Sequence, residues 1–170
     1  GLNAQGIPYL EFTMTSLFTL PSAKPVIAPD YSNFEDPDVA TSANTPTFTI
    51  GGDDFVMRDF ALMRAAKVER RLLIGKEAVV ISDADESVKA QVEAVPLATY
   101  DPFAIAQDRT KQAIQLVHGN EAGKIATIDL PNCQQMRAGQ SVDNQGVEEW
   151  PLSFSPLPVA GNDQWSITLT

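Results

Sequence analysis

Apolar and polar residues alternate in pieces through residues 45–81, and short turn sequences separate the pieces. The alternation predicts four strands in succession: Thr47–Ile50, Phe55–Met63, Lys67–Ile74 and Ala78–Ile81. Between them lie the pair Gly51-Gly52, which can supply the positive φ of a tight hairpin turn, a break at Ala65-Ala66 and a turn at Gly75-Lys76. Strands joined this closely cannot be parallel, so we expect an antiparallel meander that ends at Ser82-Asp83.

A longer amphipathic run precedes this stretch, at Tyr9–Leu20. Leu10, Phe12, Met14 and Leu20 fall on one face of the predicted strand, and the other face is mostly polar. At about 3.3 Å per residue this strand could reach roughly 40 Å, which is long for a globular protein. A strand of this length is typical of an extended sheet or of an assembly.

The segment between these two stretches is rich in proline and in acidic and small residues. Because proline cannot occupy a central strand, residues 21–46 are predicted to be an irregular, exposed loop or arm with an edge strand at Val26–Ile27. Residues 1–44 are therefore interpreted as an N-terminal strand plus a proline-rich arm, and residues 45–170 as a β-sandwich, with one domain overall.

The second half of the chain predicts more strands and one helix. Asp101-Pro102 is typical of an N-cap followed by proline at the first helical position, so a short helix is expected over Pro102–Gln107. Val88–Leu97 has both helical and strand character, and its alternation favours a strand. The other predicted strands are Gln112–Val117, Lys124–Leu130, Cys133–Met136, Glu149–Leu157 and Trp165–Leu169. Turns are expected at residues 120–123, 144–146 and 161–163. The expected fold is mainly β, an antiparallel sandwich or partly open barrel with one short helix.

Composition narrows the class of protein. The chain has 170 residues, a formal net charge of −10 and one cysteine, Cys133. A surface this acidic repels nucleic-acid phosphate, which argues against a protein that reads DNA. One cysteine allows no internal disulfide and no cysteine-type zinc site. No apolar run approaches the length of a membrane-spanning helix. Gly1, without an initiator Met or a leader, is interpreted as a cut end.

The candidate reactive residues lack the neighbours that catalysis requires. His118 is the only histidine, and no sequence pattern supplies a partner carboxylate or nucleophile. The cluster Asp83, Asp85 and Glu86 has Val88 and Ala94 where a calcium loop needs Gly and Glu, so it is interpreted as a solvated turn. Cys133 has no basic neighbour in the sequence and is expected to be inert.

Three further patterns are also incomplete. Gly139-Gln140-Ser141 lacks the second Gly of a nucleophile elbow, and Gly51-Gly52-Asp53-Asp54 lacks the Lys of a phosphate loop. Trp150 and Trp165 could face a sugar, but a lone strand Trp is more often core or interface. We therefore assign no catalytic, cofactor-binding or metal-binding residue, and we do not expect an enzyme.

Five pieces of sequence follow one another in a set order: TPTFTIGGDDF, VERRLLIGKEAVVISDAD, ATYDPFAIAQ, IQLVHGNEAGKIATIDLPNCQ and DNQGVEEWPLSFSPLPVAGNDQWSITL. In this order they resemble the tail tube (major tail) proteins of long-tailed bacteriophages and prophages, over Thr45–Thr170. GIPYLEFTMTSLF is similar to a strand that follows an earlier region in larger members. This chain would then be the C-terminal part of a longer protein.

The resemblance implies a structural virion protein without catalysis or cofactor. Members of that family form a β-sandwich with one helix and assemble into six-fold rings. The rings stack into a tube through which DNA passes without sequence-specific binding, and an acidic lumen keeps the DNA from sticking. The implied partners are other copies of the chain, six in a ring, and other phage tail proteins, with no membrane. The implied location is the phage tail, after synthesis in the bacterial cytoplasm.

This reading leads to two expectations and leaves two rivals. Deleting residues 22–44 is expected to abolish assembly while the fold stays intact, and Phe154, between Ser153 and Ser155, is expected to be buried. One rival is another tail component of the same fold, such as a tail tip or terminator ring. The other is a carbohydrate-binding module, which would need Tyr9, Tyr100 or Trp150 exposed in one plane. An enzyme would need a pocket that joins His118 to Asp or Ser residues.

Overall fold

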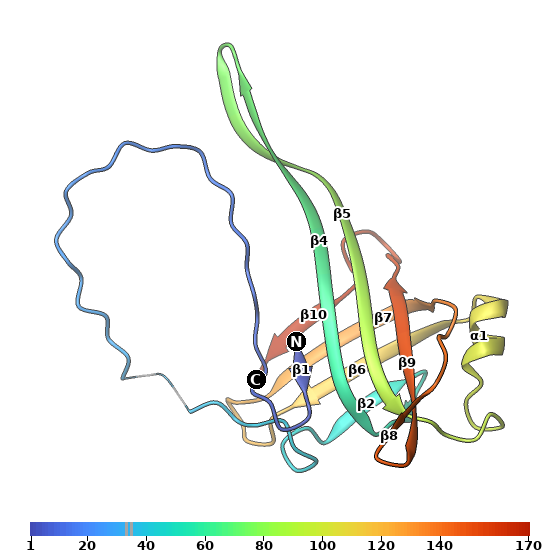
Figure 1. Cartoon of the computed structure of the whole chain (residues 1–170). Helices are drawn as coiled ribbons and strands as arrows, with labels where there is room; N and C mark the ends of the chain where they lie inside the picture. The colour runs from blue at the N-terminus through green and yellow to red at the C-terminus, as the bar shows by residue number, and fades with distance from the viewer. Residues whose placement is uncertain (33, 35) are drawn as a thin grey trace.

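The computed structural model describes residues 1–32, 34 and 36–170, and its fold is mainly β with one short helix. All strand pairs are antiparallel and belong to one sheet that is not closed into a barrel. The sheet bends over on itself into two layers, so that β4, β5 and β9 cross in front of β6, β7 and β10 (Figure 1). This arrangement confirms the predicted sandwich class.

The first layer has the strand order β1-β4-β5-β9, with β8 paired to β9. Its strands are β1 Leu2–Asn3, β4 Met57–Leu73, β5 Lys76–Glu93, β8 Val142–Asn144 and β9 Val147–Pro156. The second layer continues from β9 through β7 and β6 to β2 and β3, and β10 also pairs with β7. Its strands are β2 Thr47–Ile50, β3 Asp53–Asp54, β6 Lys111–His118, β7 Ala126–Gln135 and β10 Ser166–Leu169.

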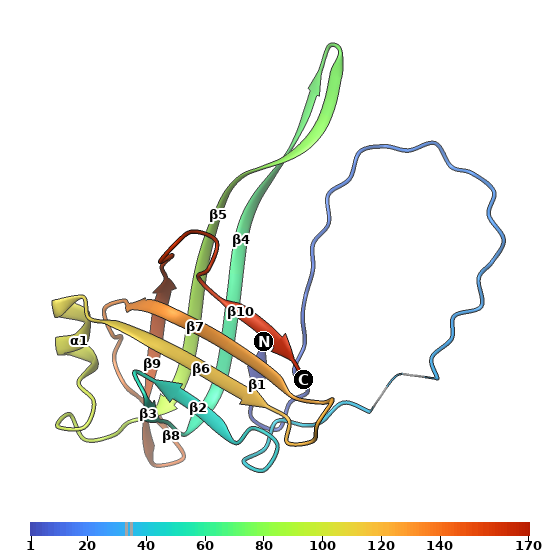
Figure 2. The same ribbon diagram turned by 180° about the vertical axis from the view of Figure 1, so that it is seen from behind.

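Strand β7 joins the two layers because two strands share one of its edges. Ser166–Leu169 pairs with residues 126–129 at one end, and β9 pairs with residues 133–135 at the other end. Strand β9 then pairs with β5 in the first layer. Seen from behind, β6, β7 and β2 form the near layer, and the two chain ends lie close together beside it (Figure 2).

The core lies between the layers and is built from alternating side chains. In β9, Leu152 and Phe154 are each 1% exposed, whereas Ser153 and Ser155 are half-buried, which confirms the predicted burial of Phe154. An edge-to-face contact of Phe48 with Phe60, 5.9 Å between ring centroids, connects β2 to β4 across the sandwich. Both layers therefore contribute large apolar side chains to one core.

The single helix, α1 (Pro102–Asp108), forms where the sequence predicted it. The Asp101 carboxylate accepts hydrogen bonds from the backbone N–H groups of Phe103 and Ala104, at 2.9 and 3.0 Å. Arg109 ends the helix in the left-handed conformation, φ 55°. Capping at both ends explains why so short a helix is stable.

The hairpin formed by β4 and β5 differs from the predicted short strands. The expected break at Ala65-Ala66 is wrong, because these residues pair in register with Asp85 and Ala84. The expected end at Ser82-Asp83 is also wrong, since β5 runs on to Glu93. The strand expected at Val88–Leu97 is the second half of β5 and ends before residue 94. A bulge where Lys67 is followed by Val68 absorbs Ser82.

The expected meander is only partly present. Gly51 and Gly52 have φ values of 66° and 97° and close the hairpin of β2 with β3, as expected. Strand β2 pairs with β6, however, and not with β4. The chain therefore changes layers at Phe55, whose ring is buried against Tyr100 with 4.9 Å between centroids.

The strand expected at Tyr9–Leu20 is absent, and so is the edge strand expected at Val26–Ile27. These residues run as extended, unpaired chain. Strands require hydrogen-bonding partners, and within the described residues this chain provides none for them beyond Gly1, which bonds to Tyr9. Within the described residues there is also no helix long and apolar enough to cross a membrane.

Candidate assembly surface

Two parts of the chain leave the sandwich, and the first is the far half of the β4–β5 hairpin. Strand β1 pairs with β4 only at Asp59 and Phe60, and β9 pairs with β5 only from Val88 to Glu93. Residues 61–87, here called the arm, therefore have no described strand on either outer edge (Figure 1). Open strand edges are templates for pairing with another chain.

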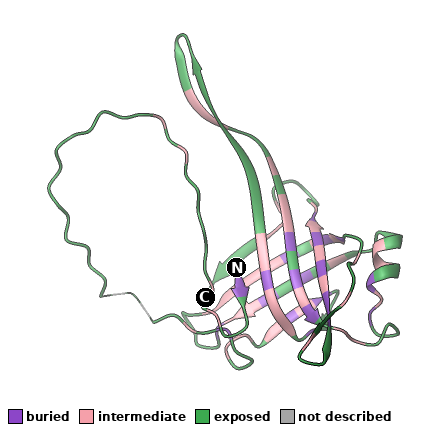
Figure 3. Ribbon diagram, in the orientation of Figure 1, coloured by how far each residue is buried: buried purple, intermediate pink, exposed green. Residues whose placement is uncertain are grey.

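The tip of the arm is apolar and exposed. Leu72, Leu73 and Ile74 are 65%, 53% and 107% exposed, and the arm is largely green in the burial view of Figure 3. Gly75, φ 84°, makes the turn between the strands. Burying one such side chain stabilises a protein by about 1.5–3 kcal/mol, so three at one tip favour a contact that the single chain does not provide.

The face of the arm that continues the core is also uncovered. Directly paired residues share a face of a sheet, and Leu62 with Val88 is the last such pair packed in the core. Two residues further along each strand comes Arg64 with Glu86, Nε to Oε1 3.4 Å, and beyond it Val68 pairs with Ile81. Val68 and Ile81 are 37% and 64% exposed, because the second layer does not extend over the arm.

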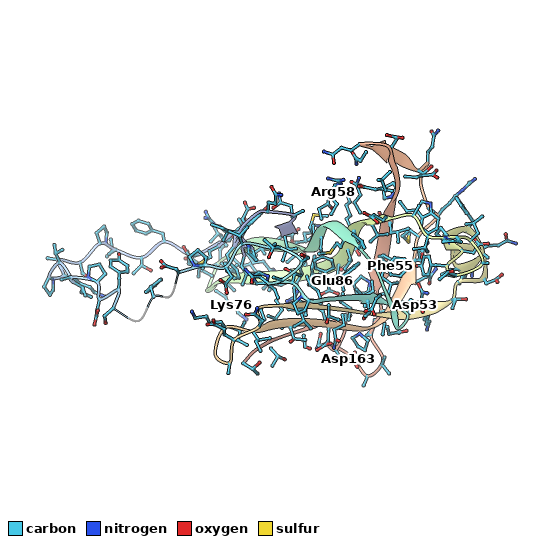
Figure 4. All side chains as sticks on the ribbon, turned by 90° about the horizontal axis from the view of Figure 1, so that it is seen from below. Asp53, Phe55, Arg58, Lys76, Glu86 and Asp163 are labelled. Carbon is cyan, nitrogen blue, oxygen red and sulfur yellow. The ribbon has the colours of Figure 1, made fainter. Side chains whose placement is uncertain are left out.

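The second projecting part is the extended segment, residues 7–32. Its apolar side chains are exposed, and they include the residues that alternate in the sequence: Leu10, Phe12, Met14, Phe18 and Leu20. In the view from below, the far end of this loop stands away from the rest of the molecule (Figure 4), whereas residues 16–19 line a pocket together with Arg70 of the arm. The segment thus has the composition of a strand without a sheet to join.

A buried carboxylate ties the strands of the first layer together at the end away from the arm. Glu149 on β9 is 2% exposed and forms a bidentate ion pair with Arg58 on β4. Gln91 Nε2 and Asn144 Nδ2 also donate to Glu149 Oε2, at 2.5 and 3.0 Å. The hydrogen bonds from Arg58, and then those from Asn144 and Gln91, lower the pKa of Glu149 to about 2.

This cluster joins four strands, β4, β5, β8 and β9, at the end of the first layer away from the arm, since Glu149 pairs with Glu93 at the end of β5. The sequence analysis missed it because its members lie far apart in the chain. The one available signal was an acidic residue, Glu149, between Glu148 and an apolar strand interior. None of its members lines the pocket described below, and its hydrogen bonds serve to hold the strands together.

The sequence candidates for chemistry are not brought together. His118 Nδ1 lies 3.0 Å from the hydroxyl of Thr45. Asp83 and Asp85 share one face of the arm, whereas Glu86 lies on the other face with Arg64. In the described part of the chain no group of three His, Cys, Asp or Glu residues could hold a metal ion.

Cys133 is fully buried, and burial raises the pKa of its thiol to about 12, so the thiolate does not form near neutral pH. Tyr9, Tyr100 and Trp150 do not form the exposed aromatic plane that a sugar-binding module would need. Tyr100 and Trp150 are 3% and 6% exposed and belong to the core, and of the three only Tyr9 is exposed. Trp165 packs against the same core.

A pocket of about 500 Å³ lies between the N-terminal turn and the start of β4. No acidic or basic residue lines it, and His118 is outside it. Its walls include Leu2, Ala40, Phe48 and Phe55 from the edge of the core. The pocket therefore does not bring His118 together with Asp or Ser residues, as the enzyme alternative would require.

The arm and the extended segment thus share two features. Their backbone edges have no strand partner, and their apolar side chains are not covered by the rest of the chain. Comparison with known proteins adds no family to this picture, since no protein-family model and no curated protein matches the chain.

Proposed function

We propose that this chain is a self-assembling structural subunit of the tail tube of a long-tailed phage or prophage. Copies of it form rings, with six as the expected number, and the rings stack into a tube through which DNA passes. Its location is the virion tail, where it contacts further copies of itself and other tail proteins. The proposal rests on the ordered sequence resemblance together with the arm.

The single observation that carries it is the arm, a two-stranded ribbon whose outer edges are both unpaired over residues 61–87. An isolated two-stranded ribbon is marginally stable in water. Pairing with ribbons of neighbouring copies would satisfy both edges at once, and a ring removes edges altogether. Burial of the tip residues Leu72, Leu73 and Ile74 between stacked rings adds an apolar contribution.

The net charge of −10 supports the same proposal. DNA that moves through a channel must not bind its wall, and an acidic subunit disfavours the phosphate contacts that would hold it. The charge is a permissive argument, because acidity also promotes solubility.

Size-exclusion chromatography with light scattering tests the proposal. We expect a mass that is several times the 18.4 kDa of one chain and that increases with concentration. A mass of one chain at every concentration would overturn self-assembly. A discrete ring that never elongates would instead favour a terminator or tail-tip role.

A further inference from the structure

The arm has opposite charges on its two strands. Within the arm, β4 carries four basic residues and one acidic residue, and β5 carries four acidic residues and one basic residue. The basic residues of β4 are Arg64, Lys67, Arg70 and Arg71, and the acidic residues of β5 are Glu77, Asp83, Asp85 and Glu86. In a chain of net charge −10, a strand segment with more basic than acidic residues is unexpected, and it would attract an acidic surface.

The charges are also balanced between the two faces of the ribbon. Alternation along β4 and the pairing register place Arg64 and Arg70 on the face that continues the core, and Lys67 and Arg71 on the outer face. On β5, Glu77 and Glu86 share the first face, and Asp83 and Asp85 share the second. The face that continues the core thus has two cations along the β4 edge and two carboxylates along the β5 edge. The outer face has an excess of the same sign on each strand, with Glu69 added on β4 and Lys76 added on β5.

Few of these charges are neutralised inside the single chain. Arg64 contacts Glu86 at 3.4 Å, and Lys67 contacts Glu69, its neighbour on the same strand and face, at 3.0 Å. Arg70 and Arg71 lie directly across from Val79 and Ala78 and form no ion pair with any described residue.

We propose that the β4 edge of one copy pairs with the β5 edge of the next copy, so that the interface between copies is heterologous and directional. This inference rests on the proposed self-assembly and specifies its geometry. Like edges, β4 with β4 or β5 with β5, are disfavoured because they oppose like charges. Unlike edges attract, and β5 beside a neighbouring β4 is antiparallel, as β4 and β5 already are within one chain.

The pairing register favours a second copy of this chain as the partner of the arm's open edges. When neighbouring copies are related by rotation about an axis along the arm, residues at equal heights meet. Glu77 pairs with Leu72 within its own chain, so it would lie diagonal to Arg70 of the next copy on the same face. Diagonal neighbours on adjacent strands are within reach of long side chains. A heterologous interface of this kind closes into a ring when the rotation between neighbouring copies is a whole fraction of a turn.

Two charge-reversed variants test this geometry. One has Arg70→Glu and Arg71→Glu on the β4 edge, and the other has Glu77→Lys on the β5 edge. Within their own arms these positions face uncharged residues, Val79, Ala78 and Leu72, so reversal places no like charges directly opposite. Arg137→Glu, an exposed position outside the arm, is the matched control.

Each variant alone is expected to lose assembly, measured by light scattering, because like charges then meet at every junction. An equimolar mixture is expected to regain it, since each reversed edge then meets its complement and the two variants alternate around the ring. The control is expected to assemble as the unmodified chain does. Assembly of the unmodified chain should weaken from 0.1 to 1 M salt, as the screening length falls from about 10 to about 3 Å.

Assembly of both single variants at the level of the unmodified chain would overturn the directional pairing while leaving self-assembly in place. A mixture that remains monomeric while the unmodified chain assembles would overturn it as well. A mixture that stops at a dimer would indicate pairing of like edges and would also overturn it. If the unmodified chain and the mixture are both monomeric, the proposed function itself fails.

Discussion

At the scale of single residues, Phe154 carries a large share of the core. It is 1% exposed on β9, at the strand that belongs to both layers. Phe154→Ala is expected to lower the free energy of unfolding by about 3–5 kcal/mol, because the lost ring leaves a cavity between two packed layers. Thermal or urea denaturation measures it. Phe18→Ala, at an 83% exposed position, is the control, and equal effects of the two substitutions would contradict this placement.

Glu149 makes stability depend on pH. Its pKa is lowered from 4.5 to about 2, so the folded state holds the charged form better than the unfolded state does. The resulting stabilisation is fully present above about pH 4.5 and is lost as pH falls from there towards 2. Glu149→Gln is expected to cost about 1.5–3 kcal/mol at pH 7, because hydrogen bonds to a charged group are lost.

The difference in stability between the unmodified chain and Glu149→Gln should shrink as pH is lowered through this window. Denaturant unfolding at pH 7, 5 and 3 measures it, with Glu11→Gln on the extended segment as the control. A difference that stays constant from pH 7 to 3 would show that the carboxylate charge is not what holds β4, β5, β8 and β9 together.

At the scale of elements, the extended segment should be dispensable for folding. Its residues contribute no side chain to the buried core, which takes Leu2 before it and Ala40 after it. The deletion of residues 22–44 expected from the sequence would remove Ala40 and the Asn44 carbonyl that accepts from Gly119 N–H. Replacing residues 10–32 with a short Gly-Ser linker is therefore the sharper variant.

This variant is expected to unfold at the same temperature as the unmodified chain and to assemble less well. The amphipathic residues between Leu10 and Leu20 would no longer be available to a neighbouring copy. Calorimetry and light scattering on the same sample separate the two effects. Unchanged assembly would show that the segment takes no part in the contact between copies.

Elements with local signals could be predicted from the sequence. Helix α1 follows from Asp101-Pro102, because its capping atoms lie within a few residues of each other. The hairpin of β6 with the first part of β7 follows from alternation around a turn, although β7 runs without a break to Gln135 where the sequence predicts two strands, Lys124–Leu130 and Cys133–Met136. The continuity of β4 could not be predicted, since pairing with β5 overrides the weak strand preference of Ala65 and Ala66.

The same distinction explains the unpaired Tyr9–Leu20. Its apolar and polar residues alternate as they do in a strand. A strand also needs backbone hydrogen-bonding partners, and the alternation gives no information about those. The cluster around Glu149 shows the opposite case. Arg58 and Glu149 are 91 residues apart in the chain, and the pairing of β4 with β5 and of β5 with β9 brings them together. Tertiary contacts of this kind produce no regular spacing in the sequence from which they could be predicted.

At the scale of the whole molecule, the chain combines a well-packed sandwich with projecting parts that it cannot cover itself. The body has a continuous core and a buried ion pair at Glu149, whereas residues 61–87 and 7–32 expose apolar side chains and unpaired backbone. A monomeric protein rarely keeps surfaces of this size and character. The division suggests that the sandwich provides rigidity and the projections provide contacts.

Negative-stain electron microscopy of the purified chain, taken from the main chromatographic peak, tests this account most directly. The account predicts rings of several copies with a central channel, or tubes made by stacking them. Uniform single particles the size of one chain, at the highest concentration that stays in solution, would contradict it.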